Sequence, residues 1–283
     1  MTTATAGFLA PPLRIALAGD WHANTAYAVE AVRHARRRDS DVVIQLGDFG
    51  FRFLDTYLDE LDAALADDDL ILGFVDGNHE DFDRLLAIPV ASDGLRYLRE
   101  RIVHIPRGFR WVWAGIECLA VGGAYSIDRF LRTPGETWWP QETITDDQIR
   151  VISAAGSADV MFCHDCPTGV ANPVLARRGY GYPPEALAES ERNRDRLRHI
   201  VDAVRPRRLW HGHFHFRYQS ILNGNDYHTV VDGLGRDGDP IDNNMVVVNV
   251  EDLARNMATT QASTSAATAT GASATPPSVD TPV

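Results

Sequence analysis

The amino-acid sequence predicts an α/β fold in which mixed β-sheets are flanked by helices. Its first part alternates short apolar, β-branched runs with segments of helical spacing, a pattern typical of a parallel sheet covered by helices. Later apolar runs lie close together and are separated by glycine, which indicates antiparallel strands. With 283 residues, of which 45% are hydrophobic, the chain is long enough to bury the core of one large domain.

Strands and helices alternate strictly in the first part of the chain. Strands are predicted over 14–19, 41–47 and 70–77, and helices over 24–38 and 54–68. Each of these strands ends in glycine and a polar residue. This order predicts a parallel sheet whose strand ends carry polar groups.

The sheet type is expected to change in the second part. Three apolar runs over 102–123 are predicted as antiparallel strands, with a glycine turn between the last two. Alternation then returns with a helix near 145–155, a strand over 158–164, a long helix within 184–204 and a strand that runs into "HGHFH" at 211–215. The last apolar runs, 217–222, 226–231 and 244–250, are predicted as antiparallel strands.

The domain organisation follows from a shift in composition. We expect an N-terminal arm over 1–12, one folded domain over 13–253, and a tail over 254–283. The tail is rich in Ala, Thr and Ser and has few large apolar residues, so burial cannot offset its ordering entropy and disorder is expected. A terminal helix is the alternative for its first residues only.

Charge and cysteine content exclude several classes of function. The formal net charge is −12, and binding of long nucleic acid is not expected because such binding depends on basic side chains that neutralise phosphates. The three cysteines are too few and odd in number for a disulfide framework, which favours a cytoplasmic location. No run resembles a secretion signal or approaches the length of a membrane span, so no membrane association is expected.

Five polar clusters stand at the ends of apolar runs: "GDWH" (19–22), "GDFG" (47–50), "GNHE" (77–80), "CHD" (163–165) and "GHFH" (212–215). Each alone is explained by turn or capping residues. Together they supply carboxylate, amide and imidazole donors suited to Mn, Fe or Zn, and ligands of α/β sheets gather beyond the carboxyl ends of the strands. In an extended chain the alternate histidines of "HGHFH" would share one face, which predicts either a metal site or a polar edge.

The order DxH, GD, GNHE, H and GHxH resembles the calcineurin-like metallophosphoesterase superfamily, over residues 14 to about 250. The resemblance implies a four-layer α/β/β/α sandwich and a metal-dependent phosphoric ester hydrolase. The segment 122–142 is similar to bacterial and bacteriophage members.

The resemblance also implies a site with two divalent metal ions, with manganese favoured and iron, zinc or nickel also accepted by the donor set. In it Asp20, His22 and His215 would bind one ion. Asn78, His164 and His213 would bind the other, and Asp48 would bridge both. His211 lies outside the motif and is expected to pack or support the site. The cysteines Cys118, Cys163 and Cys166 are expected to be small buried or flanking groups, because no second CxxC pair is present for a zinc knuckle.

In the reaction that the resemblance implies, a hydroxide bridging the two ions attacks the phosphate in line, and His79 donates a proton to the leaving oxygen or stabilises charge there. Arg52 stands where Ser/Thr protein phosphatases have a phosphate-binding arginine, and it is equally well explained as an exposed, solvated side chain. Phe51 stands where that branch has the carboxylate that orients the catalytic histidine.

The double histidine of "GHFH" resembles the phosphodiesterase and nuclease branches, which favours a small nucleotide-type phosphodiester as the substrate. The alternatives are a phosphomonoesterase, including a protein phosphatase, and a non-catalytic scaffold that keeps the fold. Residues of the segment 122–142 would form a substrate lid with aromatic faces for a base, namely Tyr125, Asp128, Arg129, Arg132, Trp138 and Trp139. The tryptophans are alternatively core residues, and we expect at least one of them to be buried.

Overall fold

The computed structural model describes residues 7–175 and 181–256. The predicted tail therefore lies outside the described residues, except for 254–256, which end a helical segment over 250–256. A terminal helix at this point is the alternative that the sequence left open. In the predicted N-terminal arm, Phe8 is buried and its ring lies 5.7 Å from that of Trp111 and 5.4 Å from that of Trp113.

The first of two sheets has the strand order β12-β1-β2-β3-β5-β4. Its central strands β1, β2, β3 and β5 are parallel, whereas the edge strands β12 and β4 pair antiparallel with their neighbours. The bounds are β1 (Arg14–Ala18), β2 (Val42–Gln45), β3 (Ile71–Phe74), β4 (Arg96–Tyr97), β5 (Ile102–His104) and β12 (Met245–Asn249). All four residues of β2 and of β3 are buried, as expected for parallel strands that are covered on both faces.

The second sheet has the order β10-β11-β9-β8-β7-β6. Strands β7, β8, β9 and β11 are parallel, and β6 and β10 are antiparallel edges. The bounds are β6 (Arg110–Trp113), β7 (Ile116–Val121), β8 (Val160–Cys163), β9 (Arg208–His211), β10 (Tyr218–Asn223) and β11 (His228–Gly233).

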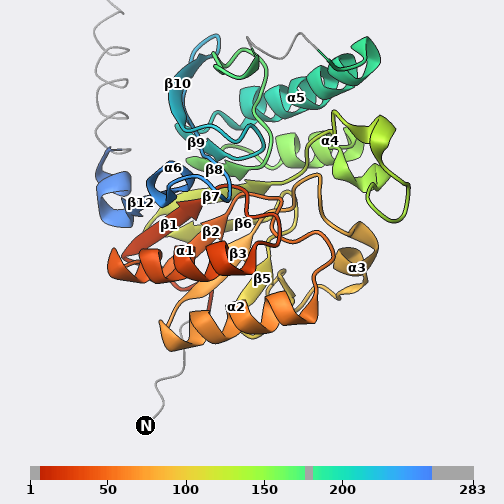
Figure 1. Ribbon diagram of the computed structural model, residues 1–283. Coiled ribbons are helices and arrows are strands. Elements are labelled where there is room, and N and C mark those ends of the chain that lie inside the picture. The colour runs from red at the N-terminus through yellow and green to blue at the C-terminus, as the bar shows by residue number, and fades with distance from the viewer. Residues whose placement is uncertain (1–6, 176–180, 257–283) are drawn as a thin grey trace, which may run out of the picture.

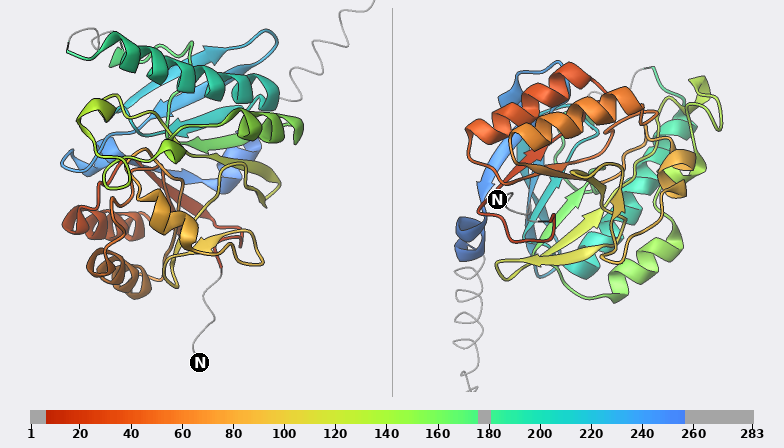
Figure 2. Two further views of the ribbon diagram at one scale, coloured as in Figure 1. Left: turned by 90° about the vertical axis from the view of Figure 1, so that its right-hand side faces the viewer. Right: turned by 90° about the horizontal axis from the view of Figure 1, so that it is seen from below.

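Helices cover the outer face of each sheet, which gives the four layers that the resemblance implies (Figures 1 and 2). Helices α1 (Thr25–Arg37) and α2 (Asp55–Asp67) lie on the first sheet, and α4 (Asp146–Ala154) and α5 (Pro184–Val204) on the second. Shorter helices are α3 (Phe82–Ala87) and α6 (Ile241–Asn244), with 3₁₀ turns at Arg129–Leu131 and Pro140–Glu142. The α/β class with mixed sheets is thereby confirmed.

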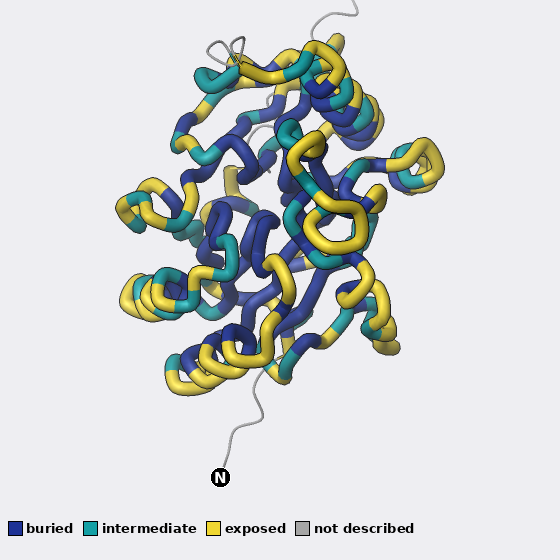
Figure 3. Tube along the Cα trace, turned by 45° about the vertical axis from the view of Figure 1, so that its right-hand side comes forward, coloured by how far each residue is buried: buried dark blue, intermediate teal, exposed yellow. Residues whose placement is uncertain are grey.

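Three apolar clusters hold these layers together, and the middle one fills the space between the sheets. It contains Ile15 and Leu17 from the first sheet and Phe162 and Trp210 from the second, all at most 1% exposed. Figure 3 shows buried chain through the middle of the molecule and exposed chain along the outer helices. Because burial is continuous across both sheets, the loops at their ends are held in fixed relative positions.

Local sequence signals explain where the helices begin. The side chain of Asn24 accepts a hydrogen bond from the backbone N–H of Tyr27 at the start of α1. Thr145 and Gln148 form a reciprocal capping box at the start of α4. No helix within the described parts of the chain has both the length and the apolar character needed to cross a lipid bilayer.

The prediction for 102–123 was partly wrong. The β6–β7 pair is an antiparallel hairpin whose turn has positive φ at Ala114 (49°) and Gly115 (83°), as the glycine indicated. Strand β5, however, is parallel to β3 and belongs to the first sheet. The chain therefore crosses from the first sheet to the second between β5 and β6, since β6 pairs with β7 of the second sheet. Strand β12 is antiparallel, as predicted, and its partner is β1 of the first sheet.

Candidate metal centre

The loops that follow β1, β2 and β9 share an uncommon backbone conformation. His22, Asp48, His213 and His215 have φ values of 48°, 52°, 63° and 54°, in the left-handed region that non-glycine residues rarely adopt. Such conformations cost free energy and gather at functional sites, where the surrounding structure enforces them. Four of the seven predicted metal ligands are held in this way.

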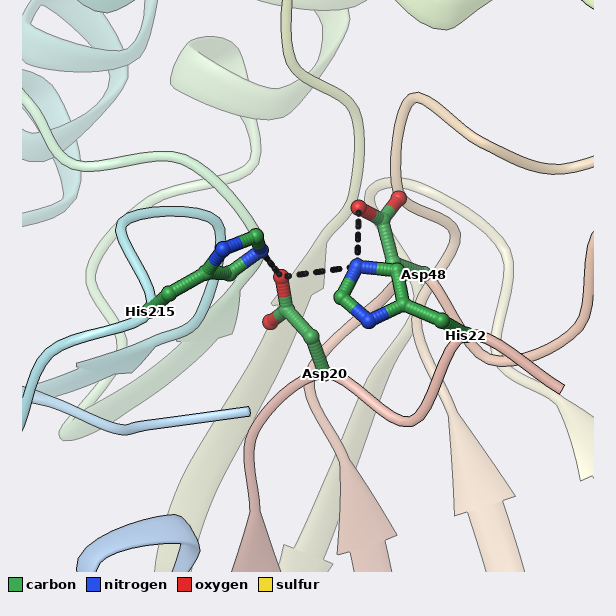
Figure 4. Close-up of side chains that lie close together, drawn as sticks. All are labelled: Asp20, His22, Asp48 and His215. Atoms are coloured by element: carbon green, nitrogen blue, oxygen red, sulfur yellow. Dashed lines mark ion pairs between the residues drawn. The ribbon is translucent and has the colours of Figure 1, made fainter. Parts of the chain in front are cut away.

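Four predicted ligands form a compact group, which Figure 4 shows with the side chains turned toward one another. In this group each of Asp20, His22, Asp48 and His215 offers one donor atom, and these atoms lie within 4.8 Å of one another. His215 Nε2 lies 3.0 Å from Asp20 Oδ2, and His22 Nε2 lies 3.6 Å from Asp48 Oδ2. The group spans both sheets, since β1 and β2 belong to the first and β9 to the second.

The other three predicted ligands lie on the opposite side of Asp48. His164 Nε2 is 3.4 Å from Asp48 Oδ1 and 3.1 Å from Asn78 Oδ1. The ring of His213 lies 5.1 Å from that of His164, and the His213 backbone N–H donates to Asp20 Oδ1 at 3.0 Å. The fold thus brings all seven residues together, and the two oxygens of Asp48 face two different groups of donors.

The charges of this cluster are suited to cations. Burial by itself lowers the pKa of His22, but Asp48 and Asp20 raise it to about 9. Burial also opposes the charge on His164, yet Asp48 raises its pKa to about 10. Burial would raise the pKa of Asp48, but His79 and His164 hold it well below its usual range. The buried carboxylates favour positive charge at this place, and together with the imidazoles they form a donor set that fits the metal ions that the resemblance implies.

Two of the histidines are oriented by hydrogen bonds on the far side of their rings. His22 Nδ1 donates to Asp237 Oδ1 at 2.7 Å, and His164 Nδ1 donates to the carbonyl of Leu46 at 2.6 Å. Both bonds leave Nε2 directed at Asp48, which is the arrangement found for metal-binding histidines. Asp237 was not predicted, and its signal in the sequence is a polar loop, "GRDGDP" (235–240), after an apolar strand.

The amide of Asn78 is oriented by the buried pair Ser126 and Glu142, neither of which was predicted as part of the site. Asn78 Nδ2 donates to Ser126 Oγ at 3.1 Å, and Ser126 donates to Glu142 Oε2 at 2.6 Å and, through its backbone N–H, to Glu142 Oε1 at 2.9 Å. Glu142 is fully buried, and burial raises its pKa to about 7 although the bonds from Ser126 oppose this. Since the Asn78 nitrogen is engaged, its oxygen is the atom turned to His164.

His79 lies beside this cluster. Its backbone N–H donates to Asp48 Oδ1 at 2.9 Å, while its Nε2 is 3.8 Å from Asp48 Oδ2. The ring of Phe51 lies 5.1 Å from that of His79. Arg52 is exposed, and its guanidinium makes no hydrogen bond or ion pair with any residue that the structure describes. The arginine that does contact His79 is Arg132.

The segment 122–142 lies over the site, but its residues differ in exposure. Trp139 is buried, as expected for at least one of the tryptophans, and Tyr125 is also buried. Trp138 is half-buried, and the guanidinium of Arg129 lies 3.9 Å from the centre of its ring. That face of Trp138 is therefore covered by Arg129 and does not offer a free stacking surface to a base.

The expectation that the three histidines of "HGHFH" share one face of an extended chain was wrong. Strand β9 ends at His211, and the left-handed backbone of His213 and His215 turns the chain toward the metal cluster. His211 is buried, and its Nε2 lies 2.7 Å from the hydroxyl of Tyr218, so it supports the packing behind the site. The three cysteines are free and buried, as predicted.

Comparison with known proteins identifies the family of this chain and its fold. The sequence profile described as calcineurin-like phosphoesterase matches residues 13–217, more than half of the chain. Among solved structures, a dimetal phosphatase from Danio rerio is 13% identical with a TM-score of 0.50, covering 83% of this chain and 92% of that one. The protein TT1561 of Thermus thermophilus is 12% identical with a TM-score of 0.46, covering 84% of this chain and 99% of that one. No match was found among curated proteins. The chain therefore belongs to the calcineurin-like phosphoesterase family and is a metal-dependent phosphoric ester hydrolase.

Proposed function

We propose that this protein is a dinuclear metal-dependent phosphodiesterase that hydrolyses small nucleotide-type phosphodiesters. The observation that carries the proposal is the position of Asp48, whose Oδ2 faces His22 at 3.6 Å while its Oδ1 faces His164 at 3.4 Å. A carboxylate between two groups of nitrogen and oxygen donors is suited to bridging two cations.

In this proposal Asp20, His22 and His215 hold one divalent ion and Asn78, His164 and His213 hold the other, with Asp48 shared. Manganese is the favoured metal because carboxylate and amide oxygens accompany the imidazoles, and iron, zinc and nickel also accept these donors. When bound, the two cations acidify water and withdraw charge from the phosphate.

His79 acts on the substrate in this proposal and does not bind metal. Its backbone is fixed by Asp48, and its side chain, 21% exposed, lies beside the cluster. From this position it donates a proton to the leaving oxygen of the ester.

The surroundings of His79 favour a diester over the phosphomonoester of a Ser/Thr protein phosphatase. Phe51 replaces the orienting carboxylate of that branch, and the exposed Arg52 offers no contact at the site. The second candidate, a phosphomonoesterase, is favoured by one observation: the guanidinium of Arg132 beside His79 adds positive charge, which suits a dianionic phosphate. A non-catalytic scaffold is disfavoured because all seven donors and His79 are kept together.

The charge and the thiols of the chain support the remaining parts of the proposal. A net charge of −12 disfavours long nucleic acid as the substrate, since small esters are held by bound cations and not by a basic surface. Three free, buried cysteines fit a reducing cytoplasm.

The test is hydrolysis of bis-p-nitrophenyl phosphate beside p-nitrophenyl phosphate, with added Mn²⁺ and an EDTA control. We expect the diester to be cleaved faster and EDTA to abolish activity. His79→Ala should keep its metal content and lose turnover by about 100-fold or more, whereas Asp48→Ala should lose metal. His199→Ala, which alters an exposed histidine on α5, is the matched control. Faster cleavage of the monoester would make the phosphomonoesterase the better reading; one metal ion or none per chain would refute the dinuclear site.

A further inference from the structure

Both terminal nitrogens of the Arg132 guanidinium lie close to the ring of His79. Its Nη1 lies 2.8 Å from His79 Nδ1 and its Nη2 lies 2.9 Å from His79 Nε2. A neutral imidazole has one acceptor nitrogen and a protonated one has none, so at most one of these two approaches is a hydrogen bond. At least one N–H of Arg132 therefore points toward His79 but finds no acceptor on the His79 ring.

A carboxylate fixes Arg132 in this position. Asp128 accepts from Arg132 Nε at 2.7 Å and from Nη2 at 2.8 Å, which is a bidentate pair. The carbonyl of Thr137 accepts from Nη1 at 3.2 Å. The side chain of Arg132 is 13% exposed, so this guanidinium is set in the segment 122–142 and is not a freely moving surface group.

The guanidinium lies at the edge of the metal cluster. His79, which it contacts, is 3.8 Å from Asp48 Oδ2 through Nε2, and the rings of His79 and His22 are 5.8 Å apart. An anion held at the cluster next to His79 is therefore within reach of Arg132. The exposed Arg52 has no comparable tether among the described residues.

We propose that Arg132 binds a non-bridging oxygen of the substrate phosphate beside His79, and that Asp128 is the positioning residue that holds it there. This inference rests on the proposed function, because it takes the phosphate to be bound at the cluster. The ligand class is a phosphate-type oxyanion, which accepts the N–H groups of a planar guanidinium better than those of an ammonium group.

The test measures binding as well as turnover. Inorganic phosphate is titrated into Mn²⁺-loaded protein by calorimetry, and KM and kcat are measured with bis-p-nitrophenyl phosphate. Arg132→Ala should weaken phosphate binding by about 10- to 100-fold, the range for a hydrogen bond to a charged group, with metal content unchanged. KM should rise by more than kcat falls. Arg132→Lys should restore part of the affinity because it keeps the charge but loses the bidentate pair with Asp128.

Two further variants separate recognition from folding. Arg150→Ala removes an exposed arginine of α4 that pairs with Asp147, and it should leave phosphate binding unchanged. Asp128→Asn should weaken phosphate binding less than Arg132→Ala does, and the double variant should be no weaker than Arg132→Ala alone, because both changes act through one guanidinium.

The outcomes distinguish this inference from the proposed function. Unchanged phosphate affinity and KM in folded, metal-loaded Arg132→Ala would overturn the role of Arg132 while leaving a His79-dependent esterase in place. If the wild-type protein cleaved neither ester, the phosphate titration would still decide whether Arg132 binds the anion. Should Arg132→Ala fail to fold, Arg132→Lys replaces it, and wild-type phosphate affinity together with wild-type KM in that variant would contradict the bidentate geometry.

Discussion

His22 Nδ1 donates a hydrogen bond to Asp237 Oδ1 at 2.7 Å, across 215 positions of the sequence. The other oxygen of Asp237 accepts from Asn24 Nδ2 at 2.9 Å, so the carboxylate itself is held in place. This pair fixes which nitrogen of His22 faces the cluster. It also links the loop after β1 to the loop after β11.

Removing this carboxylate should weaken metal binding without unfolding the protein. Asp237→Ala frees the His22 ring to rotate and to change tautomer, and loss of such partners typically costs about 10- to 100-fold in metal affinity. Competitive titration with a chelating dye measures the affinity of each variant. Asp226→Ala, which removes an exposed carboxylate paired with Arg205, is the control and should bind metal as the wild type does. Equal metal affinity in both variants would show that Asp237 does not orient His22.

The Ser126–Glu142 pair should act on the other side of the site. Ser126→Ala removes the acceptor for Asn78 Nδ2 and frees the amide to flip, so its nitrogen can turn to the position that its oxygen now holds. We expect the second metal equivalent to bind about 10-fold more weakly and the first to be unaffected. Glu142→Gln should have a smaller effect in the same direction, because a Gln side chain still accepts from Ser126 with its oxygen. Elemental analysis after dialysis at a series of Mn²⁺ concentrations would test this, and equal weakening of both equivalents would contradict it.

Metal binding should release protons at neutral pH. His22 and His164, with pKa values raised to about 9 and about 10, carry protons in the metal-free protein at pH 7, and a cation must displace them. Apparent affinity should therefore fall as pH falls, by about tenfold per pH unit for each proton displaced. Calorimetry at pH 7 in buffers of different ionisation enthalpy counts the protons. A heat of binding that is independent of the buffer would show that these imidazoles are already neutral.

The same pKa values predict how stability varies with pH when no metal is bound. Both are raised above the unfolded value of about 6.5, so the native state binds more protons than the unfolded state between these values. The contribution of His22 and His164 to stability is thus fully present below pH ~6.5 and is lost as pH rises through 9 and 10. Denaturation midpoints of metal-free protein across this range should fall, and His22→Ala should flatten the dependence.

Much of the site was predictable because its ligands follow strands. Asp20, Asp48 and Asn78 come directly after buried runs of a parallel sheet, where chain order alone indicates a common edge. The supporting residues give no such signal. Asp237 follows β11 of the second sheet and contacts His22 after β1 of the first, so this contact depends on how the two sheets pack, which local sequence does not encode. Glu142 ends a 3₁₀ turn and meets Ser126 within the same irregular segment, where no strand or helix pattern indicates the contact.

The errors in the fold have a similar cause. Strand β5 has three residues and pairs with β3 along the edge that β2 leaves free. Its apolar pattern does not distinguish parallel from antiparallel pairing. His213 and His215 are spaced two residues apart, as in a strand, but the chain turns there because contacts with the metal cluster hold it. Asp20 accepts the His213 backbone N–H, and a Cβ at Gly212 would lie 2.1 Å from Asp20 Oδ1, so only glycine permits this approach.

Asp76 and Arg107 form a buried ion pair that ties the strand before Asn78 to the segment over the site. Arg107 Nε and Nη2 lie 2.8 and 2.5 Å from Asp76 Oδ2, and Arg107 also donates to the carbonyls of Glu142 and Thr143. Burial would raise the pKa of Asp76, but Arg107 and its neighbour His104 hold it well below its usual range. Asp76 is therefore ionised in the folded state.

Arg107→Met should be among the most destabilising single changes in this chain, because it leaves the buried carboxylate of Asp76 without its main partner. Removing one member of a buried pair costs about 3–5 kcal/mol, whereas Arg205→Met, which breaks an exposed pair with Asp226, should cost less than about 1 kcal/mol. Urea denaturation of both variants measures the difference.

In the wild type the stabilisation from Asp76 is present above the unfolded pKa of about 3.9 and is lost as pH falls toward the lower folded value. Because Arg107 is the largest cause of the depressed folded pKa of Asp76, Arg107→Met should be less sensitive to acid than the wild type. An equally steep loss of stability in both proteins would show that the pair does not hold Asp76 ionised.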